Sequence, residues 1–187
     1  RPRDWSSDVC SSDLAPVMDE LNRRRAVVFT HPVRADCCRN LMPGVGENVL
    51  ELATDTARTI TSLLVSGTPA RCPNLRFIFS HAGGTLPVLT GRIIQLYAAS
   101  KEFAQRLPQG PLPELKRFYY DTANASNEWS LAPLMKLVSV SQLLLGSDFP
   151  LRSPEANVKE LAELGFSSED LRAIYRDNAV KLLPGLA

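Results

Sequence analysis

Short apolar runs alternate with longer segments of helical periodicity along most of the chain. Four of these runs have the length and the β-branched or aromatic content of strands that are covered on both faces. They are residues 26–30 (AVVFT), 75–80 (LRFIFS), 118–122 (FYYDT) and 142–146 (QLLLG). Helical segments separate them, which predicts an α/β fold with a parallel sheet.

Helices are predicted between and after these strands because apolar residues recur every three or four positions. Ser153 and Pro154 have the order of an N-cap and a first helical residue, and Ser167 or Ser168 can cap the last helix. Residues 107–113 contain three prolines and are interpreted as a long connection. The predicted helices are residues 47–66, 87–99, 154–164 and 167–183.

The number of βα units limits the architecture. A complete (β/α)8 barrel has eight units and about 250 residues. This chain has 187 residues and four predicted strands. We therefore expect a truncated barrel, with about half of the usual units.

The first 14 residues lack the pattern of the rest. They are rich in serine and aspartate, and residues 4–14 (DWSSDVCSSDL) resemble the translation of a sequencing-library adapter. A natural disordered leader is the alternative. We expect residues 1–14 to be a disordered, non-native leader, residues 15–187 to be a partial domain, and the true upstream coding sequence to be missing.

Composition and charge narrow the class of partner. Lys and Arg number 21 against 20 Asp and Glu, so the chain offers no broad attraction to nucleic acid or anionic lipid. No apolar run is long enough to span a bilayer. The four cysteines lack the spacing of a zinc finger or a disulfide framework, and the vicinal pair Cys37 and Cys38 is interpreted as inert. We expect a soluble cytoplasmic protein that acts on a small molecule.

Three polar residues follow the apolar runs directly. His31 and His81, the two histidines of the chain, come after the first and second strands, and Asp148 comes after the fourth. Strand ends converge at the carboxyl-terminal face of a parallel barrel, and imidazole and carboxylate are ligands of zinc and similar ions. Each histidine could instead be a hydrogen-bonded loop residue, and Asp148 could cap a turn before Pro150. Asp121 could be a core residue or line the pocket.

A family resemblance joins these observations. The segments VVFTHP, FIFSHAGGTLP, FYYDTA, LLLGSDFP and YRDNAVKLL resemble, in order and spacing, the second half of the amidohydrolase-2 group that includes aminocarboxymuconate-semialdehyde decarboxylase. The resemblance covers residues 26–183. The stretch CCRNLMPGVGENVLELATDTARTITSLLVSGT is similar to the 6-methylsalicylate decarboxylase branch. The resemblance implies the C-terminal half of a (β/α)8 barrel of the metal-dependent hydrolase superfamily, truncated at its N-terminus.

The resemblance also implies roles for individual residues. His31 and Asp148 match the metal-binding histidine and aspartate that follow the fifth and eighth barrel strands. His81 matches a histidine that transfers protons without binding the metal, and Asn178 matches a structural position. The metal is expected to be a divalent ion, zinc first and manganese second. The HxH or ExH pair of the family's first strand, which supplies its other ligands, is absent from this sequence.

These roles imply non-oxidative decarboxylation of an aromatic or related unsaturated carboxylic acid. Asp148 would carry the proton and His81 would relay or tune it. Hydrolysis of a lactone or amide in the same pocket is an alternative, because fold and ligands do not choose between the reactions. A non-catalytic fragment with open strand edges is another. The intact protein is expected to form homo-oligomers, with neither nucleic acid nor membrane as a partner.

Overall fold

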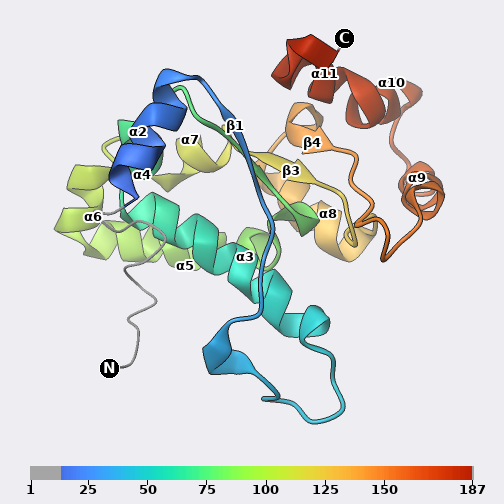
Figure 1. Ribbon diagram of the computed structural model, residues 1–187, viewed down its shortest axis with the longest axis horizontal. Helices are drawn as coiled ribbons and strands as arrows, with labels where there is room; N and C mark the ends of the chain where they lie inside the picture. Colours follow the sequence, from blue (N-terminus) through green and yellow to red (C-terminus); the bar gives the residue numbers. More distant parts are fainter. Residues whose placement is uncertain (1–13, 187) are drawn as a thin grey trace.

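A computed structural model describes residues 14–186 of the chain and contains one parallel sheet in the order β1-β2-β3-β4 (Figure 1). The register pairs Phe29 of β1 with Ile78 of β2, and Tyr120 of β3 with Leu143 of β4. All four predicted strands are confirmed, with shorter bounds. The strands are β1 (Val27–Thr30), β2 (Arg76–Phe79), β3 (Tyr119–Asp121) and β4 (Leu143–Leu144).

Helices connect and follow the strands, and the predicted crossover helix between the first two strands is confirmed as α3. Ser153 and Pro154 begin α9 as predicted, and the Ser167 hydroxyl caps α10 by accepting from the backbone N–H of Asp170. The helices are α2 (Ala15–Arg23), α3 (Glu47–Val65), α4 (Thr68–Arg71), α5 (Leu86–Ala99), α6 (Lys101–Arg106), α7 (Pro111–Leu115), α8 (Glu128–Leu137), α9 (Pro154–Ala162), α10 (Ser168–Arg172), a π-helical segment η4 (Ala173–Asp177) and α11 (Asn178–Leu182). Short 3-10 turns are η1 (Asp36–Cys38), η2 (His81–Gly83), η3 (Val140–Gln142) and η5 (Pro184–Leu186).

Two parts of the helical prediction need correction. The connection predicted over residues 107–113 already contains the start of α7, where Pro111 stands in the first turn and needs no hydrogen-bond partner for a backbone N–H. The prediction also omitted α2, α4, α6 and α8. Of these, α8 contains Pro133 but begins at a well-formed cap, with the Asn127 side chain accepting from the backbone N–H of Ser130. Apart from Leu14, the leader predicted over residues 1–14 lies outside the described residues.

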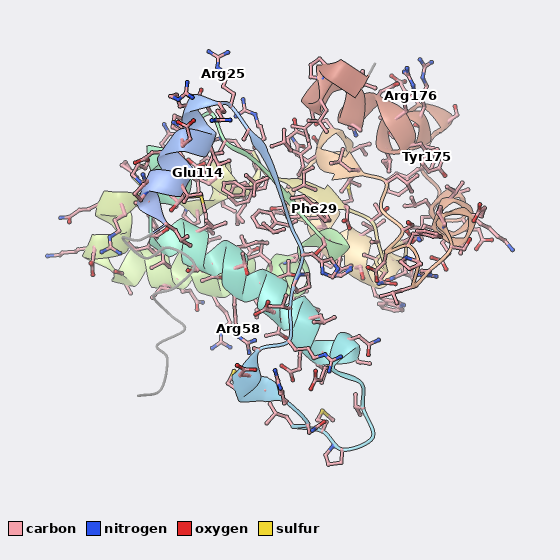
Figure 2. All side chains as sticks on the ribbon, viewed as in Figure 1. Arg25, Phe29, Arg58, Glu114, Tyr175 and Arg176 are labelled. Carbon is pink, nitrogen blue, oxygen red and sulfur yellow. The ribbon has the colours of Figure 1, made fainter. Side chains whose placement is uncertain are left out.

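The hydrophobic core lies on one face of the sheet, against α3 and α5 (Figure 1). Phe77 and Phe79 of β2 point into it and are 2% and 0% exposed. Their alternation with Arg76 and Ile78 follows from the two-residue period of a strand. On the opposite face Phe29 is 55% exposed, and Figure 2 shows its position on β1. The face of the sheet that carries Phe29 is therefore open in the part of the chain that the structure describes.

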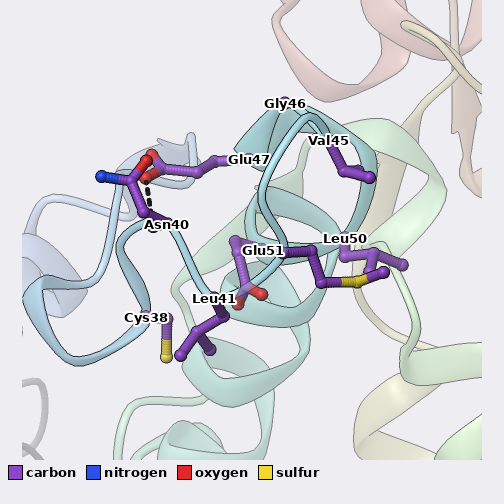
Figure 3. A pocket seen from close by; sticks show the side chains of 9 residues that line it. Cys38, Asn40, Leu41, Val45, Gly46, Glu47, Leu50 and Glu51 are labelled. Atoms are coloured by element: carbon purple, nitrogen blue, oxygen red, sulfur yellow. Dashed lines mark hydrogen bonds between the residues drawn. The ribbon is translucent and has the colours of Figure 1, made fainter.

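The connection between β1 and α3 extends away from the sheet (Figure 1). It contains η1 and a small pocket whose lining includes Cys38, Leu41, Val45 and Glu51 (Figure 3). Contacts to α3 hold it in place, among them an Arg34–Glu47 ion pair of 3.3 Å. None of the described helices is long and apolar enough to cross a bilayer.

Candidate metal centre

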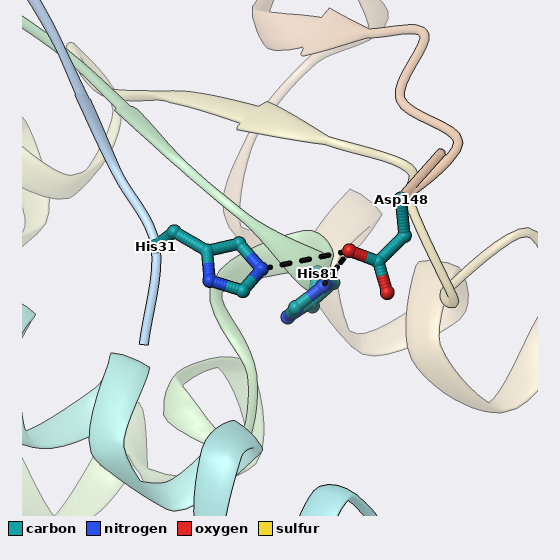
Figure 4. Close-up of side chains that lie close together, drawn as sticks. All are labelled: His31, His81 and Asp148. Carbon is teal, nitrogen blue, oxygen red and sulfur yellow. Dashed lines mark ion pairs between the residues drawn. The ribbon is translucent and has the colours of Figure 1, made fainter. Parts of the chain in front are cut away.

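Three side chains from separate parts of the sequence meet at the carboxyl edge of the sheet (Figure 4). His31 follows β1, His81 begins η2 one residue after the end of β2, and Asp148 lies in the loop after β4. His31 Nε2 lies 3.6 Å and His81 Nε2 lies 3.8 Å from Asp148 Oδ1. One ligand atom from each residue falls within 4.8 Å of the other two. The structure thus brings together all three residues that the sequence singled out.

The backbone at two of these residues is strained. His81 and Asp148 have φ values of 56° and 65°, in the left-handed region that non-glycine residues seldom adopt. Such conformations cost about 1–3 kcal/mol each and persist where surrounding contacts impose them. At His81 one such contact is a hydrogen bond of 2.8 Å from its backbone N–H to Asp121 Oδ1. With these backbone conformations, the side chains of His81 and Asp148 both lie at the candidate metal centre.

Asn124 holds the Asp148 carboxylate from the side. Its Nδ2 donates to Asp148 Oδ2 over 2.5 Å, while Oδ1 of the same carboxylate faces the two imidazoles. One oxygen is therefore fixed by an amide and the other stays available to a cation. Asn124 was not predicted from the sequence, since an asparagine in the loop after a strand has no feature that marks it as a partner of Asp148.

Asp121 is a buried carboxyl beneath the site. Its side chain accepts hydrogen bonds from the backbone N–H groups of His81 and Ala123, yet burial is the larger effect and raises its pKa to about 6. Gly146 permits this arrangement, because a Cβ there would lie 2.8 Å from Asp121 Cγ. Of the two earlier interpretations of Asp121, both hold in part, since it is buried and also lines the hollow beside the site.

The hydrogen-bond partners of the imidazoles indicate how they are protonated. His31 Nδ1 lies 3.0 Å from the carbonyl oxygen of Pro32, which can only accept, so Nδ1 carries the proton and Nε2 presents its lone pair toward Asp148. Burial lowers the pKa of His81, and His31 adds to this, while Asp148 acts in the opposite direction. The lowered pKa of His81 favours the neutral form of that ring, and the Pro32 carbonyl leaves His31 Nε2 as the nitrogen that can bind a cation.

An unsatisfied atom tests whether a metal fits here. His81 Nε2 is buried and has no hydrogen-bond partner among residues 14–186. Buried polar atoms of this kind are rare and need a partner such as an ion. A cation held by His31 Nε2 and Asp148 Oδ1 would neutralise the carboxylate, and a polar group beside that cation would be the partner that His81 Nε2 lacks. Imidazole nitrogen and carboxylate oxygen are ligands that zinc and related divalent ions accept.

The site opens into a hollow of about 520 Å³, which is within the range of small-molecule pockets. Its polar lining consists of the metal-centre residues, Asp121 and Ser147, and its apolar lining includes Phe29, Ile78, Leu144 and Phe149. A flat apolar molecule with one anionic end would match this mixed lining.

Asn178, the remaining residue singled out in the sequence, lies away from this hollow. It is 2% exposed, and its side-chain amide donates to the carbonyl oxygens of Val140 and Leu143 over 2.8 and 2.9 Å. These bonds tie the C-terminal helix to the start of β4, which agrees with a structural role.

Curated proteins with similar sequences are decarboxylases. The chain is 36% identical to decarboxylase yanB of Aspergillus niger over 184 residues, which cover 91% of this chain and 50% of the relative. It is 33% identical to the 6-methylsalicylic acid decarboxylase acuB of Aspergillus aculeatus, covering 92% of this chain and 55% of that protein. The chain therefore spans about half the length of the curated relatives it matches.

Solved structures agree on the fold. A crystal structure of an amidohydrolase II superposes with a TM-score of 0.83 at 28% identity, covering 94% of this chain and 57% of the other. The dihydroxybenzoic acid decarboxylase of Polaromonas, solved with manganese and the inhibitor 2-nitroresorcinol, superposes with a TM-score of 0.78 at 18% identity. The match covers 95% of this chain and 55% of the other. The four-stranded parallel sheet corresponds to part of a (β/α)8 barrel, as predicted.

The sequence profile of the amidohydrolase family matches residues 1–185. The match includes residues 1–14, whose origin in an adapter stays a prediction. With a profile match over nearly the whole chain, a partial (β/α)8 barrel and histidine and aspartate side chains gathered at its carboxyl edge, this chain belongs to the amidohydrolase family.

Proposed function

We propose that this site binds a divalent metal ion and serves the non-oxidative decarboxylation of an aromatic carboxylic acid. The observation that carries the proposal is the convergence of His31, His81 and Asp148 within 4.8 Å, beside a hollow with an apolar wall. The relatives named as 6-methylsalicylic acid decarboxylases support the substrate class. A hydroxybenzoic acid has the flat ring and anionic end that the hollow accommodates.

His31 and Asp148 are the proposed metal ligands, through Nε2 and Oδ1. Zinc fits this mixed nitrogen and oxygen set, and manganese is supported by the neighbour from Polaromonas that contains it. When bound, the ion supplies Lewis acidity and orients the substrate carboxylate. His81 lies almost as close to Asp148 Oδ1 as His31 does, at 3.8 Å against 3.6 Å. We assign it to proton transfer because it stands at the hollow and its ring is held neutral by burial.

The reaction exchanges one carbon–carbon bond for one carbon–hydrogen bond. Asp148 delivers a proton to the ring carbon that bears the carboxylate, which interrupts aromaticity, and His81 relays the proton to Asp148. The carbon–carboxylate bond then breaks, its electron pair restores the ring, and carbon dioxide leaves. No oxidant is needed. Phe29 and Ile78 offer an apolar surface to the ring, while Asn124 holds the second carboxylate oxygen of Asp148.

The test separates metal binding from turnover. Calorimetric titration of the metal-free chain with Zn²⁺ and Mn²⁺ measures binding first, and carbon dioxide release from 6-methylsalicylate measures turnover second. We expect Asp148→Asn to lower affinity for the metal and abolish release, and His81→Asn to lower release with a smaller effect on affinity. Full release by the Asp148→Asn variant would contradict the mechanism.

Two alternatives are outcomes of the same experiment. Release of acid from aryl lactones without carbon dioxide release would indicate metal-dependent hydrolysis. Metal binding at one equivalent with neither reaction would indicate that the 187-residue chain is a non-catalytic form. The decarboxylase proposal requires carbon dioxide release that depends on the added ion. We also propose that the active protein is a homo-oligomer, which light scattering would measure.

A further inference from the structure

A second cluster of reactive side chains lies in the connection between β1 and α3, outside the candidate metal centre. Cys37 and Cys38 are both free thiols in η1, and their Sγ atoms are 2.8 Å apart. Cys37 is exposed, whereas Cys38 is 9% exposed and borders the small pocket of Figure 3. The two sulfurs therefore form one dithiol, with one sulfur that solvent reaches directly and one beneath it.

Arg58 of α3 fixes the inner thiol. Its Nη2 lies 3.7 Å from Cys38 Sγ, and Figure 2 shows it on the side of α3 that faces the connection. The hydrogen bond with Cys37 and then burial raise the pKa of the Cys38 thiol, and the Arg58 charge opposes this without reversing it. A thiol of this kind is a poor nucleophile when it acts alone.

A ligand that bonds to both sulfurs avoids this limitation. The first bond forms at exposed Cys37, and the second becomes intramolecular because Cys38 Sγ is already in contact with Cys37 Sγ. Soft ions and metalloids favour sulfur over the nitrogen and oxygen atoms of the candidate metal centre. Formation of the second bond drives the proton from Cys38, as in metal–thiolate sites generally.

We propose that Cys37 and Cys38 form a chelating dithiol that captures trivalent arsenicals. For an organoarsenical oxide, the arsenic–oxygen bond breaks and two arsenic–sulfur bonds form. The two thiol protons leave with the oxygen as one water molecule, and no atom changes oxidation state. This site is separate from His31, His81 and Asp148, so it does not rest on the decarboxylase proposal.

The test titrates the reduced full-length chain with phenylarsine oxide in the presence of a metal chelator. A Cys10→Ser background removes a thiol outside the described residues. We expect one equivalent to bind and two thiols to disappear from a colorimetric thiol assay, with 2,3-dimercaptopropanol reversing both. Cys37→Ser should lower the affinity by about 100-fold or more, because the second bond loses its intramolecular advantage.

Cys72→Ser is the matched control, since Cys72 is a buried thiol far from η1 in the sequence. It should leave the affinity and the loss of two thiols unchanged. Cys37 is exposed, so its replacement by serine leaves the core intact, which circular dichroism would verify. Equal affinity of the Cys37→Ser variant and the parent, or an adduct that maps to Cys72, would overturn the proposal.

Discussion

Asn124 and Asp148 show how a single amide can prepare a carboxylate for a cation. Asn124 itself has a φ of 53°, so its backbone accepts strain in order to donate to Asp148 Oδ2. Loss of a partner that orients a metal ligand in this way commonly lowers metal affinity by about 10- to 100-fold. Asn124 is therefore a positioning residue, and its contribution can be measured without turnover.

Replacement of Asn124 by glycine tests that contribution. Glycine adopts a positive φ without cost, so Asn124→Gly removes the amide and leaves the backbone free to keep its conformation. We expect affinity for Zn²⁺ and Mn²⁺, measured by calorimetry, to fall by about 10-fold or more. Asn40→Gly is the control, since Asn40 also has a φ of 53° but lies in the connection before α3. Equal affinities of the two variants would exclude a positioning role.

Asp121 gives the protein a pH dependence of known sign. Its pKa is raised from 3.8 to about 6 in the folded chain. The folded chain therefore binds this proton more tightly than the unfolded chain does. The resulting stabilisation is fully present below pH 3.8 and is lost as the pH rises through about 6, and it amounts to about 3 kcal/mol for a shift of two pKa units. Asp121→Asn keeps an oxygen to accept from the backbone of His81 and Ala123 but removes the charge.

Chemical denaturation of metal-free Asp121→Asn and parent chains between pH 4 and pH 8 measures this effect. We expect the variant to be more stable at pH 8 and the difference to shrink toward pH 4. Groups that titrate alike in both chains cancel in this comparison, and the charges of His31 and Asp148 act on the pKa of Asp121 in opposite directions. Glu163→Gln, which removes one exposed carboxylate, is the control, and the Asp121→Asn difference is compared with it at each pH. A constant difference for Asp121→Asn would contradict the raised pKa.

At the scale of elements, the packing of η2 against α3 positions His81. Gly84 has a φ of 61°, and a Cβ there would lie 2.0 Å from the carbonyl oxygen of Ala53 in α3. This contact involves two backbones, so no side-chain movement can relieve it.

Two glycine-to-alanine substitutions test the contact as a matched pair. Gly84→Ala should lower the free energy of unfolding by at least about 2 kcal/mol, because it adds a clash to a strained φ. Gly91→Ala, within α5, should raise it by about 0.4–1 kcal/mol, since a Cβ there meets no atom within 4 Å. Urea denaturation measures both. Similar values for the two variants would show that η2 can move away from α3.

The strands and the longer helices could be predicted because their apolar periods are strong and local. Helix α8 could not, since Pro133 breaks its pattern and its stability comes from packing of Leu131 and Leu134 against the core. His31, His81 and Asp148 could be predicted as site residues because each follows a predicted strand. The hydrogen bond between Asn124 and Asp148 could not, because it joins two loops whose orientation depends on left-handed backbone conformations that leave no periodic pattern in the sequence.

At the scale of the whole molecule, the two faces of the sheet differ in what covers them. One face holds the aromatic cluster of Phe77, Phe79, Phe118 and Tyr120, with ring centroids of Phe79 and Phe118 5.1 Å apart. The other face carries the hollow and the exposed ring of Phe29. Parallel sheets are usually covered on both faces, so a face left open by residues 14–186 is an unusual feature.

This difference between the two faces predicts that replacing two phenylalanines on paired strands by alanine lowers the free energy of unfolding by unequal amounts. Phe79→Ala should lower the free energy of unfolding by about 3–5 kcal/mol, because Phe79 is fully buried and its removal leaves a cavity. Phe29→Ala should cost less than about 1 kcal/mol, because its ring is 55% exposed. Urea denaturation at several protein concentrations measures both. A cost for Phe29→Ala that grows with concentration would mean that a second molecule covers the open face, whereas a small cost at every concentration would mean that the face stays free for the substrate.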